Sequence, residues 1–170
     1  MPNKGMTFIE LIVALVISGF VVLIMTCLFV SEFVFQNQIA DQGAATTEAG
    51  MAMHYMARVL RYAVPSSPVT ITDNANVTSV TATIGSGYLD EITSNTAVTF
   101  SRIKTGGTAN NFTYKIGAAA ASTIATGITS FSSSYDSVNK ELFLQVTATK
   151  NTRSSLLETK VHLLGDKEVW

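Results

Sequence analysis

The sequence has few of the residues from which catalytic and metal sites are built. Its single cysteine, Cys27, excludes an intramolecular disulfide, and its place in an apolar segment predicts a packing role rather than a reactive thiol. The two histidines, His54 and His162, are far apart and have no cysteine or second histidine at metal-binding spacing. No phosphate-binding loop, nucleophile elbow or paired-cysteine motif is present. These absences argue against an enzyme and against a bound cofactor.

Charge of either sign is also scarce. The 170 residues include 11 Lys and Arg against 12 Asp and Glu, so the formal net charge at pH 7 is -1. Such a chain has no general electrostatic attraction for nucleic acid or anionic lipid, which argues against nucleic acid as a partner. The length suffices for one domain with a hydrophobic core and is short for two.

Proline is absent from Thr7 to Tyr62, a stretch in which helix-forming residues dominate. Nothing there interrupts a helix, so the sequence predicts one helix of roughly 55 residues. Pro65 and Pro68 are expected to end it. In its second half, apolar residues recur at spacings of three and four, which predicts a stripe that packs on the protein's own sheet: Ala52, Tyr55, Met56, Val59 and Ala63.

The segment Leu11 to Val30 contains twenty residues without a charged side chain. A helix of that length spans roughly 30 Å, the thickness of the hydrocarbon core of a bilayer, so the segment predicts a transmembrane helix. Lys4 precedes it whereas Glu32 and Asp41 follow it, which predicts a cytoplasmic N-terminus. Glu10, at the head of the segment, requires the membrane interface or a positively charged partner.

The residues before the apolar segment do not form a secretory signal peptide. In a signal peptide the cleavage site follows the apolar run, whereas here the basic and small residues precede it. The sequence Lys4-Gly5-Met6-Thr7-Phe8-Ile9-Glu10 instead resembles the class III leader and N-terminal helix of type IV pilins and type II secretion pseudopilins. The resemblance implies that a prepilin peptidase recognises Lys4 and Gly5, cuts between Gly5 and Met6, and methylates the new amine of Met6. Most members of the family have phenylalanine where Met6 stands, and another large apolar residue is expected to be tolerated.

The same resemblance implies an assembly role for Glu10. The carboxylate of one subunit would pair with the Met6 amine of its neighbour, and this pair would set the register between apolar helices. Outside that context, Glu10 would be explained by its place near a helix N-terminus, where the helix dipole favours a carboxylate.

From Val69 onward the period of the apolar residues changes from about 3.6 to 2, which predicts strands. Hairpin turns are expected at 137–139, 151–153 and 106–107. The runs Ala118–Ala121 and Ser132–Ser134 are of low complexity. The expected strands are Val77–Ile84, Ala97–Ile103, Phe112–Ile116, Ile128–Tyr135, Lys140–Thr149 and Ser155–Leu164.

These elements predict an α+β, pilin-like fold with a long N-terminal helix packed on a C-terminal antiparallel β-sheet. The expected domain organisation is a leader peptide at 1–5, the transmembrane and assembly half of the helix at 6–35, its amphipathic half at 36–64 and a β-rich head at 65–170. Residues 128–164 are loosely similar to minor pilins of the J-type and W-type. The apolar half lacks the proline common in major pilins, which also favours a minor subunit.

Three functions stay open. The first is a structural subunit. Its expected partners are other pilin or pseudopilin subunits, prepilin peptidase, an inner-membrane assembly platform and membrane lipid. It would be held in the bacterial inner membrane by a single helix and then enter a periplasmic or extracellular filament. The second is a pilin-like tip module whose head recognises DNA, a surface or a secreted substrate. The third is a signal-anchored membrane protein with a soluble β-domain and no filament.

Candidate ligand sites in the head are weak. Arg102, Lys104 and Lys115 could form a basic patch near Phe100, Phe112 and Tyr114, but three cations are more typical of ordinary strand residues. No acidic loop of a known calcium-binding type is formed by Asp73, Asp90, Glu91 and Asp136. Glu158 and His162, four apart in a strand, would be roughly 13 Å apart, which is too far for one metal ion. The sequence predicts no metal site.

Overall fold

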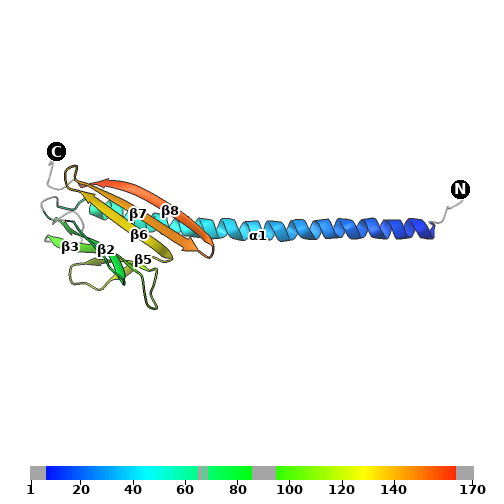
Figure 1. Cartoon of the computed structure of the whole chain (residues 1–170), viewed down its shortest axis with the longest axis horizontal. Helices are drawn as coiled ribbons and strands as arrows, with labels where there is room; N and C mark the ends of the chain where they lie inside the picture. The colour runs from blue at the N-terminus through cyan, green and yellow to red at the C-terminus, as the bar shows by residue number, and fades with distance from the viewer. Residues whose placement is uncertain (1–6, 65–66, 68, 86–94, 164–170) are drawn as a thin grey trace. The chain divides into compact units, whose positions relative to one another are not determined.

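The computed structural model describes residues 7–64, 67, 69–85 and 95–163 (Figure 1). Lys4, Gly5, Met6 and the two helix-ending prolines lie outside the described residues, as do Asp90 and Glu91. The chain divides into two compact units, Met1–Ala40 and Asp41–Trp170. The helix α1 (Phe8–Leu60) supplies the described part of the first unit and the beginning of the second.

The eight strands of the described chain form two antiparallel sheets in the second unit, where the sequence predicts one. The first sheet has the order β1-β2-β3-β4-β5 and the second has the order β6-β7-β8. Within each sheet, strands that follow one another in the sequence are paired. The strands are β1 (Thr70–Asp73), β2 (Val77–Ile84), β3 (Thr96–Ile103), β4 (Phe112–Ile116), β5 (Ser122–Ala125), β6 (Ile128–Asp136), β7 (Glu141–Lys150) and β8 (Arg153–His162).

The chain passes from the first sheet to the second at Gly127. This residue has a positive φ of 69°, and a Cβ atom built on it would be 3.0 Å from the carbonyl oxygen of Thr149. The backbone N–H of Thr149 donates a hydrogen bond of 2.8 Å to the Gly127 carbonyl, so the two backbones approach closely here. Glycine is the residue type that permits both the conformation and the approach.

The core of the second unit lies between the end of α1 and the two sheets. Of the predicted apolar stripe, Ala52, Met56 and Val59 are buried on the helix, whereas Tyr55 is partly buried. Ala63 is also buried but lies beyond the end of α1, and Leu60, which was not predicted, is fully enclosed. Tyr55 joins the helix to the first sheet, because its ring centroid lies 6.2 Å from that of Phe100 and 4.9 Å from that of Tyr114. The ring of Phe112 meets that of Phe131 edge-on at 5.2 Å and so joins the two sheets. Strand β7 alternates as expected, with these side chains buried: Leu142, Leu144, Val146 and Ala148.

Polar contacts fix the helix at the rim of this core. The Asn151 amide nitrogen, in the turn between β7 and β8, lies 2.9 Å from each carboxylate oxygen of Asp41. Glu48 accepts a 2.8 Å hydrogen bond from the backbone N–H of Thr126, which precedes β6. These contacts hold residues 41–48 of the helix against one end of the second sheet, where β6 begins and β7 turns into β8.

The predicted long helix and all six predicted strands are confirmed, with ends that differ by one or two residues. Two strands were not predicted, β1 and β5, each of four residues. All four residues of β1 are exposed. Because neither face of the strand is buried, its sequence needs no alternation of apolar and polar residues from which a strand could be predicted. The run Ser132–Ser134 lies within β6 and is fully paired with β7.

Candidate functional site

The N-terminus of α1 is closed by reciprocal hydrogen bonds between Thr7 and Glu10. The backbone N–H and the hydroxyl of Thr7 donate to the Glu10 oxygen Oε2, at 2.8 and 2.9 Å. The backbone N–H of Glu10 faces the Thr7 hydroxyl oxygen in return, at 3.4 Å. This is a capping box, in which two residues satisfy backbone donors that the first helical turn leaves free. The sequence Thr7-Phe8-Ile9-Glu10 has the Thr-x-x-Glu spacing of the motif, which is a signal for this cap in the sequence itself.

The cap leaves part of the Glu10 carboxylate available. Its second oxygen, Oε1, accepts no hydrogen bond from any described residue, and no described cation forms an ion pair with it. Glu10 is also the one charged residue between positions 8 and 31. The cap therefore holds an exposed carboxylate at the helix N-terminus, with Oε1 not used by the cap.

The first unit presents an apolar surface on every side of the helix. No large apolar side chain from Phe8 to Ile39 is buried, and the exposed fraction reaches 80% at Phe8 and 72% at Phe29. Among the described residues, α1 is the helix long and apolar enough to cross a membrane. A surface of this kind must be covered by lipid or by other apolar helices.

Two hydroxyl groups within the apolar segment are satisfied by the helix itself. The Ser18 hydroxyl donates to the carbonyl of Leu15, and the Thr26 hydroxyl donates to the carbonyl of Val22, both at 2.9 Å. Because each hydroxyl already has a hydrogen-bond acceptor within the helix, it needs no water. These hydrogen bonds lower the free-energy cost of placing the two hydroxyls in lipid or in a helix bundle. Cys27 is exposed on the same surface as a free thiol.

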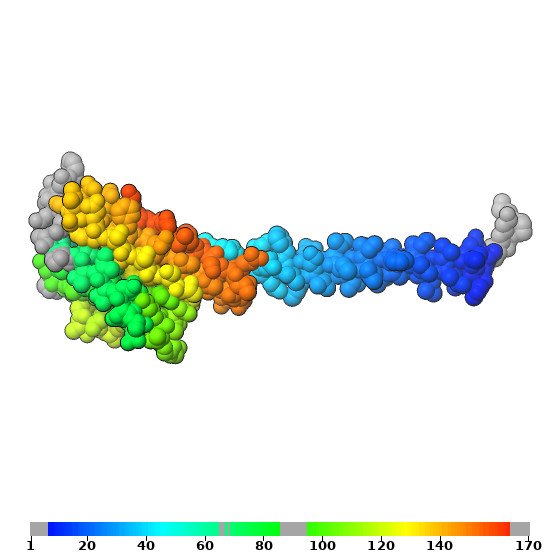
Figure 2. Space-filling view, in the orientation of Figure 1, coloured from blue at the N-terminus to red at the C-terminus, as the bar shows by residue number. Residues whose placement is uncertain are grey.

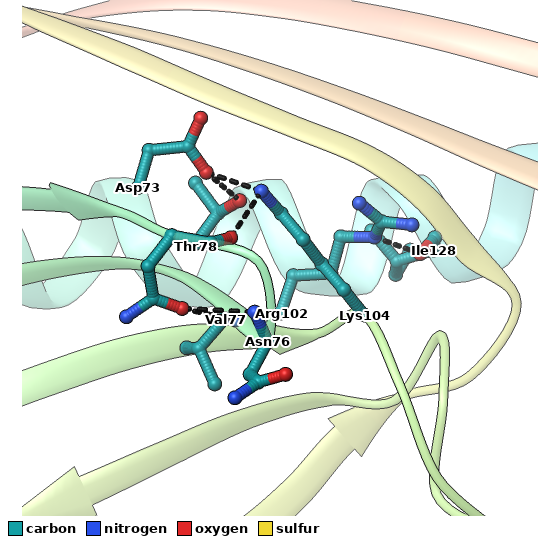
Figure 3. A network of polar contacts seen from close by, with 8 residues as sticks. Asp73, Asn76, Val77, Thr78, Arg102, Lys104 and Ile128 are labelled. Atoms are coloured by element: carbon teal, nitrogen blue, oxygen red, sulfur yellow. Dashed lines mark hydrogen bonds and ion pairs between the residues drawn. The ribbon is translucent and has the colours of Figure 1, made fainter.

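Two residues of the candidate basic patch, Arg102 and Lys104, form polar contacts within the head. Figure 3 shows Lys104 in an ion pair with Asp73, and its ammonium also donates to the carbonyl of Asn74 at 2.8 Å. Arg102 donates from Nε to the carbonyl of Ile128 at 2.8 Å, which ties β3 to the start of β6. Burial lowers the pKa of the Arg102 guanidinium. The hydrogen bond from Lys104, followed by that from Thr78, lowers the pKa of Asp73.

Two of the three aromatic residues beside these cations are too deeply buried to stack on bases. Phe100 and Phe112 are fully buried in the core, whereas Lys115 is exposed on β4. Two of the three cations are thus bonded within the protein, and two of the three rings are inaccessible. The arrangement is that of structural strand residues.

Two acidic residues of the head, Asp73 and Asp136, also accept hydrogen bonds from neighbouring groups. Asp136 accepts hydrogen bonds from the backbone N–H groups of Val138 and Asn139 in the turn after β6, at 2.9 and 3.2 Å. These bonds, with a stronger one from the Asn139 side chain, lower the pKa of Asp136. Asp73 and Asp136 belong to different sheets. Within the described ranges, no three His, Cys, Asp or Glu side chains lie close enough to hold a metal ion.

Comparison with known proteins gives one match. Residues 1–26 match the family described as the prokaryotic N-terminal methylation motif. The chain therefore carries the N-terminal signal of type IV pilins and pseudopilins, and the match ends within the apolar segment. Neither the curated proteins nor the solved structures contain a significant match to the chain.

Proposed function

We propose that the protein is a structural subunit, of the minor type, of a type IV pilus or pseudopilus filament. The methylation motif at residues 1–26 supports processing of its N-terminus. The observation that carries the proposal is the combination of this motif with a helix whose large apolar side chains are all exposed from Phe8 to Ile39. Such a helix needs apolar partners on all sides, which lipid supplies before assembly and neighbouring helices supply in a filament.

In the proposed sequence of events, prepilin peptidase cuts between Gly5 and Met6 and methylates the Met6 amine. The new terminus is cationic and stands directly before Thr7, the first residue of the cap. Residues 11–30 hold the subunit in the inner membrane with the head on the opposite side from the cut. The assembly platform then moves the helix from lipid into the bundle.

Glu10 would set the register of this bundle. Packing between apolar helices has little directional preference, because lipid chains and apolar side chains are similar surroundings. One charged pair at a fixed position is directional, and a mismatched register would leave the carboxylate unpaired in apolar surroundings. The Glu10 oxygen Oε1 is available for the Met6 amine of a neighbouring subunit, while Oε2 stays bonded to Thr7.

The test is the pair of variants Glu10→Gln and Glu32→Gln. Both remove one carboxylate from an exposed position on α1, at opposite ends of the apolar segment. The proposal predicts that both variants insert in the membrane and lose the leader, and that Glu10→Gln alone enters filaments poorly. The readout is the amount of subunit in sheared filaments relative to the membrane fraction. Equal incorporation of the two variants would refute the role assigned to Glu10.

A further inference from the structure

The outer face of the second sheet carries a groove of about 610 Å³. Figure 2 shows β6, β7 and β8 as the yellow-to-orange atoms on the face turned toward the viewer. The groove forms because β6 contributes only short side chains there, Ser132 and Ser134, whereas β8 contributes the long Glu158 and Lys160. Its volume lies within the range of about 300–1,000 Å³ that is typical of small-ligand sites.

Two rows of side chains cross this groove in register. In the first, Ser132 donates to the Gln145 oxygen Oε1 at 3.0 Å, and the Gln145 amide donates to Glu158 at 2.6 Å. In the second, Ser134 and Lys160 flank Phe143. The Lys160 ammonium lies 4.5 Å from the centroid of the Phe143 ring, and Phe143 as a residue is 37% exposed.

The charged side chains that line the groove, Glu158 and Lys160, are of opposite sign and give it no net charge. Lys160 is its one cation, and it is already shared between the Phe143 ring and the carboxylate of Glu141 at 3.8 Å. Glu158 would repel an anion, and Lys160 would repel a cation at the open ring. One positive and one negative side chain line the groove, so its charge favours a neutral ligand.

The remaining groups match a polyhydroxylated ligand with an apolar face. The negative π-face of an aromatic ring attracts the partly positive C–H groups of a sugar ring. Serine hydroxyls, an amide and a carboxylate accept and donate the hydrogen bonds that sugar hydroxyls require. A wholly apolar ligand would displace water from the Ser134 hydroxyl and the Glu158 carboxylate and would offer neither a hydrogen bond, at a cost in affinity. We propose that this groove binds a neutral glycan, an activity of the head that is independent of filament assembly.

The test is binding of full-length protein, purified in a detergent without a sugar headgroup, to an array of neutral and sialylated glycans. The inference predicts saturable binding to neutral glycans. Phe143→Ala removes the stacking ring and should weaken that binding by about tenfold. Gln145→Ala provides a second, independent variant, since it removes only hydrogen-bonding groups. Leu156→Ala is the control, because Leu156 is 54% exposed on the same strand face but does not line the groove.

Each outcome decides the inference. Loss of binding in Phe143→Ala and Gln145→Ala with retention in Leu156→Ala supports it, provided that all variants keep the wild-type circular dichroism spectrum. Absence of saturable binding to any neutral glycan overturns it, as does binding to sialylated glycans alone or an equal effect of all three substitutions. Because the assay uses unassembled protein, a failure here leaves the proposed assembly role unaffected.

Discussion

The substitution Met56→Ala tests whether the second part of α1 is integral to the core of the head. The Met56 side chain is completely buried between the helix and the sheets, whereas Met51, five residues earlier on the same helix, is 43% exposed. Truncating a buried methionine to alanine costs about 2–5 kcal/mol of unfolding free energy, since it removes buried surface and leaves a cavity. The same change at an exposed site alters stability by about 0.5 kcal/mol or less.

The assay is thermal unfolding of the full-length variants in detergent, followed by near-ultraviolet circular dichroism. This signal reports the packing of aromatic rings in the head, among them Tyr55 against Tyr114. A loss of 2 kcal/mol or more should lower the unfolding midpoint by at least about 4 °C in Met56→Ala. Met51→Ala should unfold within about 1–2 °C of the wild type. Equal shifts in the two variants would refute the reasoning, because burial would then not govern the contribution of this helix.

Three further predictions follow from the polar contacts. Thr7→Val removes the capping hydroxyl at constant shape, so membrane insertion should be normal while filament incorporation, measured by shearing, falls. The pKa of Asp73 is lowered by its bond with Lys104, so the stability it contributes is present above its unfolded pKa of 3.8 and lost on further acidification. Asp73→Asn should therefore flatten the acidic part of the stability profile measured by thermal unfolding between about pH 2 and 7. Arg102→Met leaves the buried Ile128 carbonyl without the hydrogen bond from Arg102, so the free energy of unfolding measured by chemical denaturation should fall by about 1–3 kcal/mol.

The long helix and the strands with buried faces could be predicted from the sequence, because burial on one side imposes a period that the sequence records. Strand β7 is the clearest example, with apolar residues inward at every second position. Strand β1 gives no such signal, since it is an exposed edge strand that depends on β2 for its pairing. The packing of the two sheets on each other depends on contacts between their side chains, such as Phe112 with Phe131, which no local pattern encodes.

The candidate site was predictable in part. The residues of the N-terminal motif are evident in the sequence, and the spacing of Thr7 and Glu10 is also that of the cap. The groove of the second sheet could not be foreseen. It results from short serines on one strand lying across the sheet from Glu158 and Lys160, and register between strands is a property of the folded chain.

The central claim is that the N-terminus is processed to create the amine that Glu10 meets. The most direct test is the intact mass and N-terminal sequence of the protein made in cells that contain a prepilin peptidase. The account predicts a chain that begins at Met6 and carries one added methyl group. A chain that still begins at Met1 under these conditions would contradict it, and would favour a signal-anchored membrane protein that forms no filament.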